Sequence, residues 1–341
     1  MNQRKTKVIV TLGPATADER ALRRIKEKGV DFVRINMSHS SIADLERAVR
    51  MAKEVGVPFI IDTEGSQVRT GDLEESTIYF KENTNVIVWN KPVTGNRNQL
   101  CLRPGSVLGQ LDEGDLIHID FDTLILRVSD TTTLSEGYIA TKVITGGFVG
   151  ENKAVVIDPV MQKKIDLPAL SEKDFHSIEV GLRENVEYIA VSFVRSGAAV
   201  DEARRATKNA MRIVSKIECI DALENIDEII QKSDFLLIDR GDLSKEIPIE
   251  RIPFTQKIII EKARRQNTEV FVATNLLETM VEQRKPTRAE VQDVINTLLD
   301  GAAGLTLASE TAIGKHAMEC INMLNRLISH AESVVAPGKT R

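Results

Sequence analysis

The sequence predicts an α/β fold, a (β/α)8 TIM barrel with a β-rich insert. Short apolar runs rich in β-branched residues alternate with helix-like segments, and eight such runs occur along the 341 residues. Eight is the number of strands that closes a (β/α)8 barrel. A stretch without helical periodicity interrupts the third β/α unit, which indicates an insertion. An open doubly wound sheet is the alternative, because strand number alone does not prove closure.

The first three runs read KVIVTLGP, DFVRINMSHS and PFIIDTEG. The segment after the first run has a capping-box pattern, with Thr16 as the expected N-cap and Glu19 three residues later. The segment between the second and third runs predicts a helix that ends at Gly56. After about Thr70 the chain becomes β-rich, with turn residues between short strands. We therefore expect residues 70–155 to form the insert, and residues 1–69 and 156–341 to form the barrel.

The alternation resumes with a capped helix that begins near Ser171, and five more runs follow: YIAVSFVR, RIVSKIE, FLLIDRGD, VFVATN and GLTLASET. Polar residues gather at or just after the ends of the runs, where barrel enzymes build their active sites. These residues are Arg34, Asn36, Ser38, Asp62, Thr63, Lys216, Glu218, Asp242, Thr274 and Glu310.

Composition narrows the class of protein. A net charge of −5 argues against non-specific binding to nucleic acid or to a membrane surface. The three cysteines form no CxxC pair, so neither a disulfide framework nor a zinc site is indicated. The apolar run near the start is too short for a signal peptide, and no run is long enough to span a membrane. We expect a cytoplasmic protein.

Lys216 and Glu218 lie two residues apart in the run IVSKIECI, so on a strand their side chains share one face. Glu218 ends the fifth run and Asp242 follows the sixth, which predicts two carboxylates at one rim of the barrel. Such a pair needs a cation or a proton between its members, and Mg²⁺ suits it; two solvated loop acids are the alternative. Lys216 could stabilise a phosphoryl group, form a Schiff base or only neutralise Glu218. An adjacent acid opposes a neutral amine, so the electrostatic role is favoured.

Alternation also places Arg34, Asn36 and Ser38 on one face of the second run. The Arg34 guanidinium suits phosphate or carboxylate. Asn36 and Ser38, together with Asp62 and Thr63, offer oxygens to a monovalent cation. On spacing alone, a neutral hydrogen-bonded cluster that closes the top of the barrel is favoured over a cation site.

Several motifs together resemble the pyruvate kinase family, in the family's order and over nearly the whole chain. They are TKVIVTLGPAT, VRINMSHS, IDTEGSQVRTG, IDLPALSEKD, VSFVR, VSKIE, DRGDLSKEIP, VATNLLETM, KPTRAE and SETAIGK. The resemblance implies a TIM barrel with an inserted small β-barrel lid domain over its C-terminal face. It also implies phosphoryl transfer from phosphoenolpyruvate to ADP through a magnesium-stabilised enolate.

The resemblance assigns roles to individual positions. It implies that Lys216 steadies the phosphoryl group, that Glu218 and Asp242 bind Mg²⁺ or Mn²⁺, that Gly241 contacts substrate through its backbone, and that the Thr274 hydroxyl orders proton delivery. The implied K⁺ ligands are Asn36, Ser38, Asp62 and Thr63. The implied phosphate or nucleotide contacts are Arg34, His39, Arg69 and Lys153.

The chain departs from the family pattern within the site itself. The family has Asp-Thr-Lys-Gly-Pro-Glu where this chain has DTEGSQ, so Glu64 reverses a charge and Gln67 loses one. Asp239 replaces a small residue beside the metal, and this should tighten a cation or repel an anionic substrate. Asn275 stands in for a glutamine, and Ile313 replaces a lysine that could face nucleotide phosphate. We also expect the family's C-terminal domain to be absent.

Three functions are consistent with these residues. The first is a short pyruvate kinase that uses phosphoenolpyruvate and ADP. The second is metal-dependent enolate chemistry without ADP on a different 2-oxo acid or phosphoenol substrate, as a lyase, hydrolase or transferase. The third, a catalytically silent binding protein, is the least favoured because such a protein has no need of Lys216 and both acids. The expected partners are small molecules, with no nucleic acid or membrane. Whether the protein forms a homo-oligomer is left open.

Overall fold

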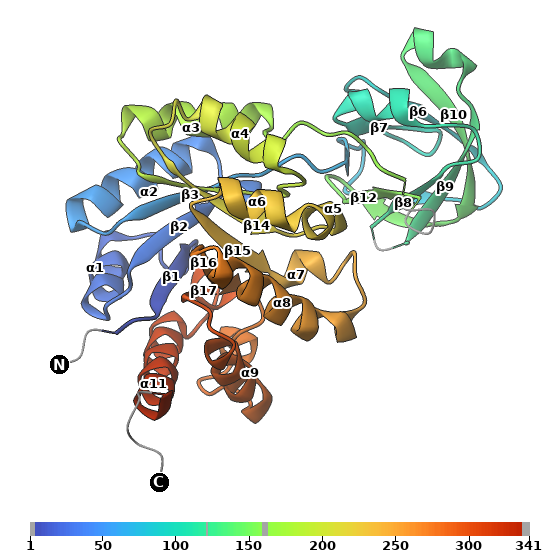
Figure 1. Cartoon of the computed structure of the whole chain (residues 1–341). Coiled ribbons are helices and arrows are strands. Elements are labelled where there is room, and N and C mark those ends of the chain that lie inside the picture. Colours follow the sequence, from blue (N-terminus) through green and yellow to red (C-terminus); the bar gives the residue numbers. More distant parts are fainter. Residues whose placement is uncertain (1–3, 121, 159–162, 336–341) are drawn as a thin grey trace. The chain divides into compact units, whose positions relative to one another are not determined.

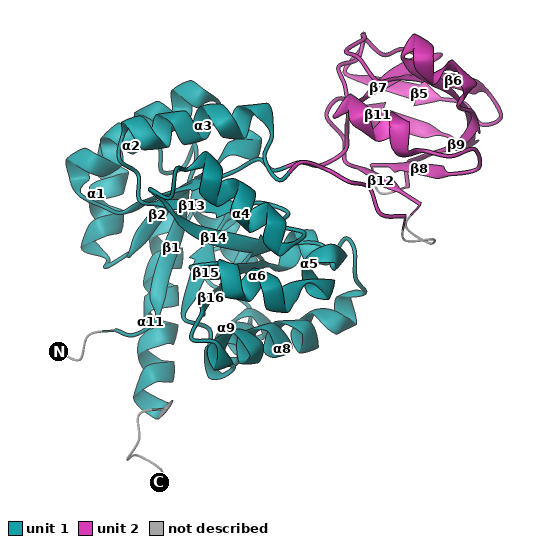
Figure 2. Ribbon diagram, turned by 45° about the horizontal axis from the view of Figure 1, so that its top comes forward, with its two compact units in different colours: residues 1–65, 169–341 teal, residues 66–168 magenta. Residues whose placement is uncertain are grey.

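The computed structural model describes residues 4–120, 122–158 and 163–335. The chain divides into a barrel unit, residues 1–65 and 169–341, and an insert unit, residues 66–168 (Figure 2). Residues 66–69 and 156–168, which we expected in the barrel, therefore group with the insert. The reason is strand pairing, because β4 (Arg69–Thr70) pairs with β7 (Gln99–Arg103) and β12 (Val155–Ile157) pairs with β8 (Leu116–Ile119).

The barrel unit contains eight parallel strands in one closed sheet, which confirms the (β/α)8 prediction over the open doubly wound sheet (Figure 1). Around the barrel the strands are β1 (Lys7–Leu12), β17 (Gly304–Leu307), β16 (Glu269–Ala273), β15 (Phe235–Asp239), β14 (Arg212–Ile217), β13 (Tyr188–Val191), β3 (Phe59–Asp62) and β2 (Phe32–Asn36). The insert interrupts the barrel unit between β3 and the next helix, α3, as the sequence predicts.

Helices surround the barrel and bury their apolar faces against it. They are α1 (Glu19–Glu27), α2 (Ile42–Val55), α3 (Glu172–Arg183), α4 (Gly197–Ala206), α5 (Ile220–Glu224), α6 (Ile226–Lys232), α7 (Arg240–Leu243), α8 (Ile252–Arg265), α9 (Arg288–Leu299), α10 (Ser309–Ala312) and α11 (Ala317–Val335). Short 3-10 helices are η1 (Met37–His39), η4 (Ile249–Arg251) and η5 (Glu278–Val281). Within the described residues, none of these helices is both long and apolar enough to cross a bilayer.

Helix ends follow the sequence signals at two positions and depart from them at a third. Ser171 caps α3 in a capping box, and Gly56 ends α2 with φ +72°. The N-cap of α1 is Asp18, whose carboxylate accepts from Ala21 N–H; the expectation of Thr16 was wrong. The Thr16 hydroxyl is buried and donates to the Thr311 carbonyl at 3.1 Å, so tertiary contact takes precedence over the local cap.

The barrel interior is layered because alternate strand residues point inward. Near the N-terminal ends of the strands, the rings of Phe32, Tyr188, Phe235 and Phe271 form an aromatic layer. Aliphatic side chains that include Ile9, Ile60, Val214 and Leu237 pack with these rings in one apolar cluster. The C-terminal layer is polar and charged, with Arg34, Asp62, Ser192, Lys216 and Asp239 all buried.

The insert unit has its own core and a seven-stranded sheet in the order β12, β8, β9, β10, β6, β7, β4, with a two-stranded sheet of β11 and β5. Its remaining elements are β5 (Thr77–Phe80), β6 (Asn85–Trp89), η2 (Gly105–Gln110), β9 (Leu124–Asp130), η3 (Thr132–Glu136), β10 (Tyr138–Thr145) and β11 (Gly147–Gly150). The two ends of the large sheet meet, since Val155 N–H donates to the Val68 carbonyl and Thr70 N–H to the Lys153 carbonyl, both at 2.9 Å. The predicted small β-barrel is confirmed, and its use as a lid stays a prediction.

Candidate active site

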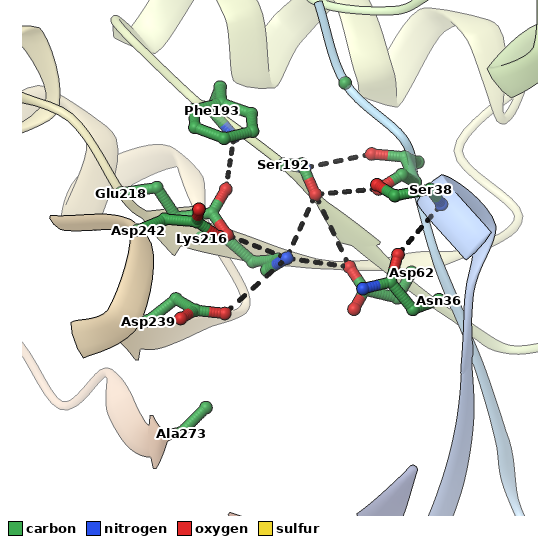
Figure 3. A network of polar contacts seen from close by, with 12 residues as sticks. Asn36, Ser38, Asp62, Ser192, Phe193, Lys216, Glu218, Asp239, Asp242 and Ala273 are labelled. Carbon is green, nitrogen blue, oxygen red and sulfur yellow. Dashed lines mark hydrogen bonds and ion pairs between the residues drawn. The ribbon is translucent and has the colours of Figure 1, made fainter. Parts of the chain in front are cut away.

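Lys216 lies at the centre of the charged layer (Figure 3). Its Nζ is 2.8 Å from Glu218 Oε1 and 3.0 Å from Asp62 Oδ1, and it donates to Ser192 Oγ at 3.0 Å. The predicted shared face of Lys216 and Glu218 is thus present. Burial opposes the charge of Lys216, but the carboxylates of Asp62 and Glu218 outweigh it and raise the pKa of the ammonium above its ordinary value. A permanently protonated amine cannot act as a Schiff-base nucleophile, so its chemistry is electrostatic.

Arg34 and Asp62 form a second buried ion pair behind Lys216. Arg34 Nη1 donates to Asp62 Oδ2 at 2.8 Å, and Arg34 Nε donates to Thr11 Oγ1 at 2.8 Å. Both side chains are almost fully buried. Asp62 therefore shares its charge between Arg34 and Lys216, which holds both cations in fixed positions.

Three carboxylates converge beside Lys216. Ligand atoms of Glu218, Asp239 and Asp242 all lie within 4.8 Å of one another, which matches the prediction that Glu218 and Asp242 meet at one rim. Glu218 Oε2 accepts from Phe193 N–H at 2.7 Å. Its Oε1 is buried and close to Lys216, yet no hydrogen bond of acceptable geometry reaches it. This oxygen, which accepts no well-formed hydrogen bond, and the all-oxygen donor set fit a hard divalent cation such as Mg²⁺ or Mn²⁺.

The charge balance of the site also favours a cation. Burial, together with the charges of Asp239 and Asp242, raises the pKa of Glu218 to about 8 against the opposing effect of Lys216. Of the neighbouring cations, Lys216 is buried and Lys245 is exposed, pairing with Asp242 at 2.6 Å from the solvent side. Like charges this close, two of them buried, favour a proton or a metal ion between them.

Thr274 sits in a strained turn directly after β16. Its φ is +68°, a value that β-branched residues rarely adopt. Gly241 N–H donates to Thr274 Oγ1 at 2.8 Å, so the hydroxyl proton is directed to Asp239 Oδ1 at 3.1 Å or to the Ala273 carbonyl at 2.6 Å. The Arg240 side chain donates to the Thr274 carbonyl at 2.7 Å and thereby holds the turn. Strain that neighbouring groups maintain is typical of functional positions.

Three of the predicted K⁺ ligands, Asn36, Ser38 and Asp62, lie close together (Figure 3), and several of their polar atoms already form hydrogen bonds. Asn36 and Asp62 are register partners on β2 and β3. Ser38 does not continue the strand, as alternation suggested; it lies in η1, where its N–H donates to Asn36 Oδ1 at 2.9 Å. Thr63 Oγ1 accepts from Ser192 N–H at 2.9 Å. The K⁺ role of these residues stays a prediction.

The predicted phosphate and nucleotide contacts are spread over both units. His39 is exposed at the end of η1 in the barrel unit. In the insert unit, Arg69 donates to the Asn152 carbonyl at 2.8 Å, and Lys153 pairs with Asp120 at 3.0 Å. Of the departures, Glu64 pairs with Lys173 at 3.2 Å, and Ile313 is 62% exposed.

Sequence reasoning gave no role to Ser192 or Arg240, although both touch the site. Ser192 contacts Lys216 directly and donates to the Thr63 carbonyl at 2.7 Å, so it links the lysine to the proposed K⁺ residues. It follows the β13 run in VSFVR, and its place at a strand end was the signal that could have found it. Arg240 sits between two acids in DRGD, where it looks like a solvated charge; its partner Asp293 is 53 residues away.

Comparison with known proteins gives one consistent result. The family model "Pyruvate kinase, barrel domain" matches residues 3–321. The pyruvate kinase of Thermotoga maritima is 34% identical over 338 residues, which cover 96% of this chain and 71% of that protein. The pyruvate kinase of Geobacillus stearothermophilus is 32% identical, over 98% of this chain and 58% of that protein.

A crystal structure of a pyruvate kinase from Cryptosporidium parvum matches with a TM-score of 0.84 and 30% identity, over 98% of this chain and 70% of that one. The chain thus spans 58% to 71% of the length of these three proteins. The resemblance seen in the motifs is confirmed at the level of the family. The chain belongs to the pyruvate kinase family.

Proposed function

We propose that the protein is a pyruvate kinase-type phosphotransferase, which moves the phosphoryl group of phosphoenolpyruvate to ADP and yields pyruvate and ATP. The observation that supports this most is the pairing of a buried, protonated Lys216 with converging carboxylates at the C-terminal rim of the barrel. Phosphoryl transfer needs little covalent chemistry from the protein and much positioned positive charge. Lys216 is held by three oxygens at 2.8 to 3.0 Å, so it is ordered before substrate binds.

Glu218 and Asp242 would hold Mg²⁺ or Mn²⁺. When bound, the metal supplies positive charge for the phosphoryl oxygens and for the enolate that remains after transfer. The Thr274 hydroxyl, oriented by Gly241 N–H, would order proton delivery to the enolate carbon. Gly241 would contact substrate through its backbone, and Arg34 would act on the phosphoryl group through the buried charge it shares with Asp62.

Further roles complete the proposal. K⁺ would bind at Asn36, Ser38, Asp62 and Thr63, close to Lys216 through Ser192. Nucleotide or phosphate would meet His39, Arg69 and Lys153.

A coupled assay of pyruvate formation with phosphoenolpyruvate, ADP, Mg²⁺ and K⁺ tests the proposal, with Lys216→Met as the inactive reference. We expect the wild-type protein to form pyruvate and ATP in equal amounts, and the variant to lose a factor of about 10² to 10³. Pyruvate formation by the wild type no faster than by the variant would overturn the proposal.

A second function has one specific observation in its favour. The buried carboxylate of Asp239 adds negative charge where an anionic substrate would approach. Metal-dependent enolate chemistry on another 2-oxo acid, without ADP, would suffer less from that charge than transfer between two phosphate-bearing substrates. This alternative predicts exchange of pyruvate methyl protons with solvent that requires a divalent cation and no nucleotide, which proton NMR in deuterated buffer measures directly.

A further inference from the structure

Asp239 occupies a position where a carboxylate is costly. It ends β15 in register with Ala273 of β16, and it is only 5% exposed. Its Oδ2 lies 3.9 Å from Lys216 Nζ, a long ion pair, while Oδ1 accepts a hydrogen bond of 3.1 Å from Thr274. Lys216 is already paired more closely with Asp62 and Glu218. The contacts of Asp239 within the protein thus leave much of its charge uncompensated.

A second observation points to a ligand at the same place. Glu218 is fully buried, and its Oε1, although 2.8 Å from Lys216 Nζ, accepts no hydrogen bond of acceptable geometry. Ligand oxygens on opposite sides of one Mg²⁺ lie about 4.2 Å apart, twice a metal–oxygen distance of about 2.1 Å. Adjacent ligands of an octahedral ion lie about 3.0 Å apart. One oxygen of each of the three carboxylates lies within 4.8 Å of the others, so side-chain movements of up to about 2 Å would bring them to one ion.

We propose that Asp239 is a third cation ligand, and that Glu218, Asp239 and Asp242 bind a divalent cation in the absence of substrate. The inference deepens the proposed function and rests on its placement of the metal at Glu218 and Asp242. Proteins usually hold Mg²⁺ with one or two carboxylates and rely on substrate oxygens for the rest. A third carboxylate replaces part of that contribution with a ligand from the protein.

The same charge has an opposite effect on an anionic substrate. Asp239 strengthens attraction for the cation and, because it lies beside Lys216, weakens the field that Lys216 presents to a phosphate or carboxylate. Removing Asp239 should therefore move two binding constants in opposite directions. A residue that only supported the fold would weaken both.

Binding of Mn²⁺ alone to the substrate-free full chain tests the proposal, with free Mn²⁺ measured by electron paramagnetic resonance. Loss of a group that merely orients a metal ligand costs about 10- to 100-fold in affinity, so loss of a direct ligand in Asp239→Ala should cost at least about tenfold. Asp239→Asn keeps the shape of the side chain and an acceptor for Thr274, and its Mn²⁺ affinity should lie between those of the wild type and Asp239→Ala. Asp234→Asn is the matched control, because Asp234 directly precedes the same strand at its opposite end; it should bind Mn²⁺ like the wild type.

Two outcomes would overturn the proposal: no Mn²⁺ binding by the substrate-free wild type, or equal affinity in wild type and both Asp239 variants. Circular dichroism shows whether each variant is folded. Asp239→Asn keeps the test decisive if Asp239→Ala does not fold. The pyruvate assay reports separately on the proposed function. Mn²⁺ binding that depends on Asp239, without pyruvate formation, would support Asp239 as a ligand and refute the proposed kinase activity. Pyruvate formation with Mn²⁺ binding that does not depend on Asp239 would support the kinase activity and refute Asp239 as a ligand.

Discussion

The two ends of the barrel interior are built by the same strands with opposite chemistry. On β14, Arg212 lies at the N-terminal end, exposed to solvent, with its guanidinium 4.6 Å from the centre of the Phe235 ring. Four residues later Lys216 is buried and surrounded by carboxylates. The N-terminal end is closed by packed aromatic rings, and the C-terminal end is filled with charge.

The difference shows how the fold separates stability from function. Aromatic burial at one end stabilises the barrel. Buried ion pairs at the other end add little to stability, since the desolvation of each charge offsets most of its attraction. The aromatic end therefore supplies stability and the charged end supplies chemistry, and four predictions test this division.

Lys216→Met should have the largest effect, because it breaks the charged end at its centre. Asp62 and Glu218 would remain buried without their shared cation, which should lower the free energy of unfolding by about 3–5 kcal/mol. Activity should also be lost. Urea denaturation at pH 8 measures the first effect. Lys232→Met, which removes a surface pair with Asp201, is the control and should change stability by about 0–1 kcal/mol; equal losses in the two variants would contradict the division.

Phe271→Ala should break the aromatic end and leave the charged end intact. Phe271 is 2% exposed, so its truncation leaves a cavity and should cost about 3–5 kcal/mol of unfolding free energy. At temperatures where the variant stays folded, its Mn²⁺ affinity should match that of the wild type. Phe254→Ala, at a ring that is 70% exposed, serves as the control with little expected change. Loss of Mn²⁺ affinity in folded Phe271→Ala would show that the two ends are coupled.

The pH dependence of stability should expose the strain at the charged end. The pKa of Glu218 rises from 4.5 in the unfolded chain to about 8 in the folded protein, so the folded state holds a proton that the unfolded state releases. The contribution of Glu218 is therefore fully present below pH 4.5 and is lost as the pH rises through about 8.

Denaturation curves between pH 5 and pH 9 without divalent cations measure this decline. Glu218→Gln cannot ionise and should show a flatter profile, and Mg²⁺ should reduce the decline in the wild type. Parallel profiles of wild type and variant would refute the assignment to Glu218.

Gly304→Ala should have the smallest effect and acts at the aromatic end. A Cβ at Gly304 would lie 2.4 Å from the Phe271 ring and 2.9 Å from the Lys7 carbonyl oxygen, so the ring and the neighbouring strand must shift. Overpacking of this kind costs about 1–3 kcal/mol. Gly109→Ala is the control, because a Cβ there meets nothing within 4 Å. Thermal unfolding compares the two, and an unchanged midpoint in Gly304→Ala would mean that the aromatic layer is loosely packed.

Periodicity made much of the barrel predictable. Alternation placed Lys216 and Glu218 on one face, and the break after the third run located the insert. The exact limits of the units were less accessible, because β4 and β12 are assigned by partners far along the chain. Thr16 shows the same limit locally, since a buried partner at Thr311 overrides a plausible cap.

The sequence by itself determined the eight strands, the insertion, the family, and the residues at the strand ends, because these follow from local periodicity and motif order. Only the tertiary structure decided which charges share a buried space. Asp62 pairs with both Arg34 and Lys216. The Arg240 side chain holds the turn at Thr274. Asp239 lies beside Glu218 and Asp242. The reason is that ion pairing and burial depend on the distances between strands, and these distances are set only when the barrel closes.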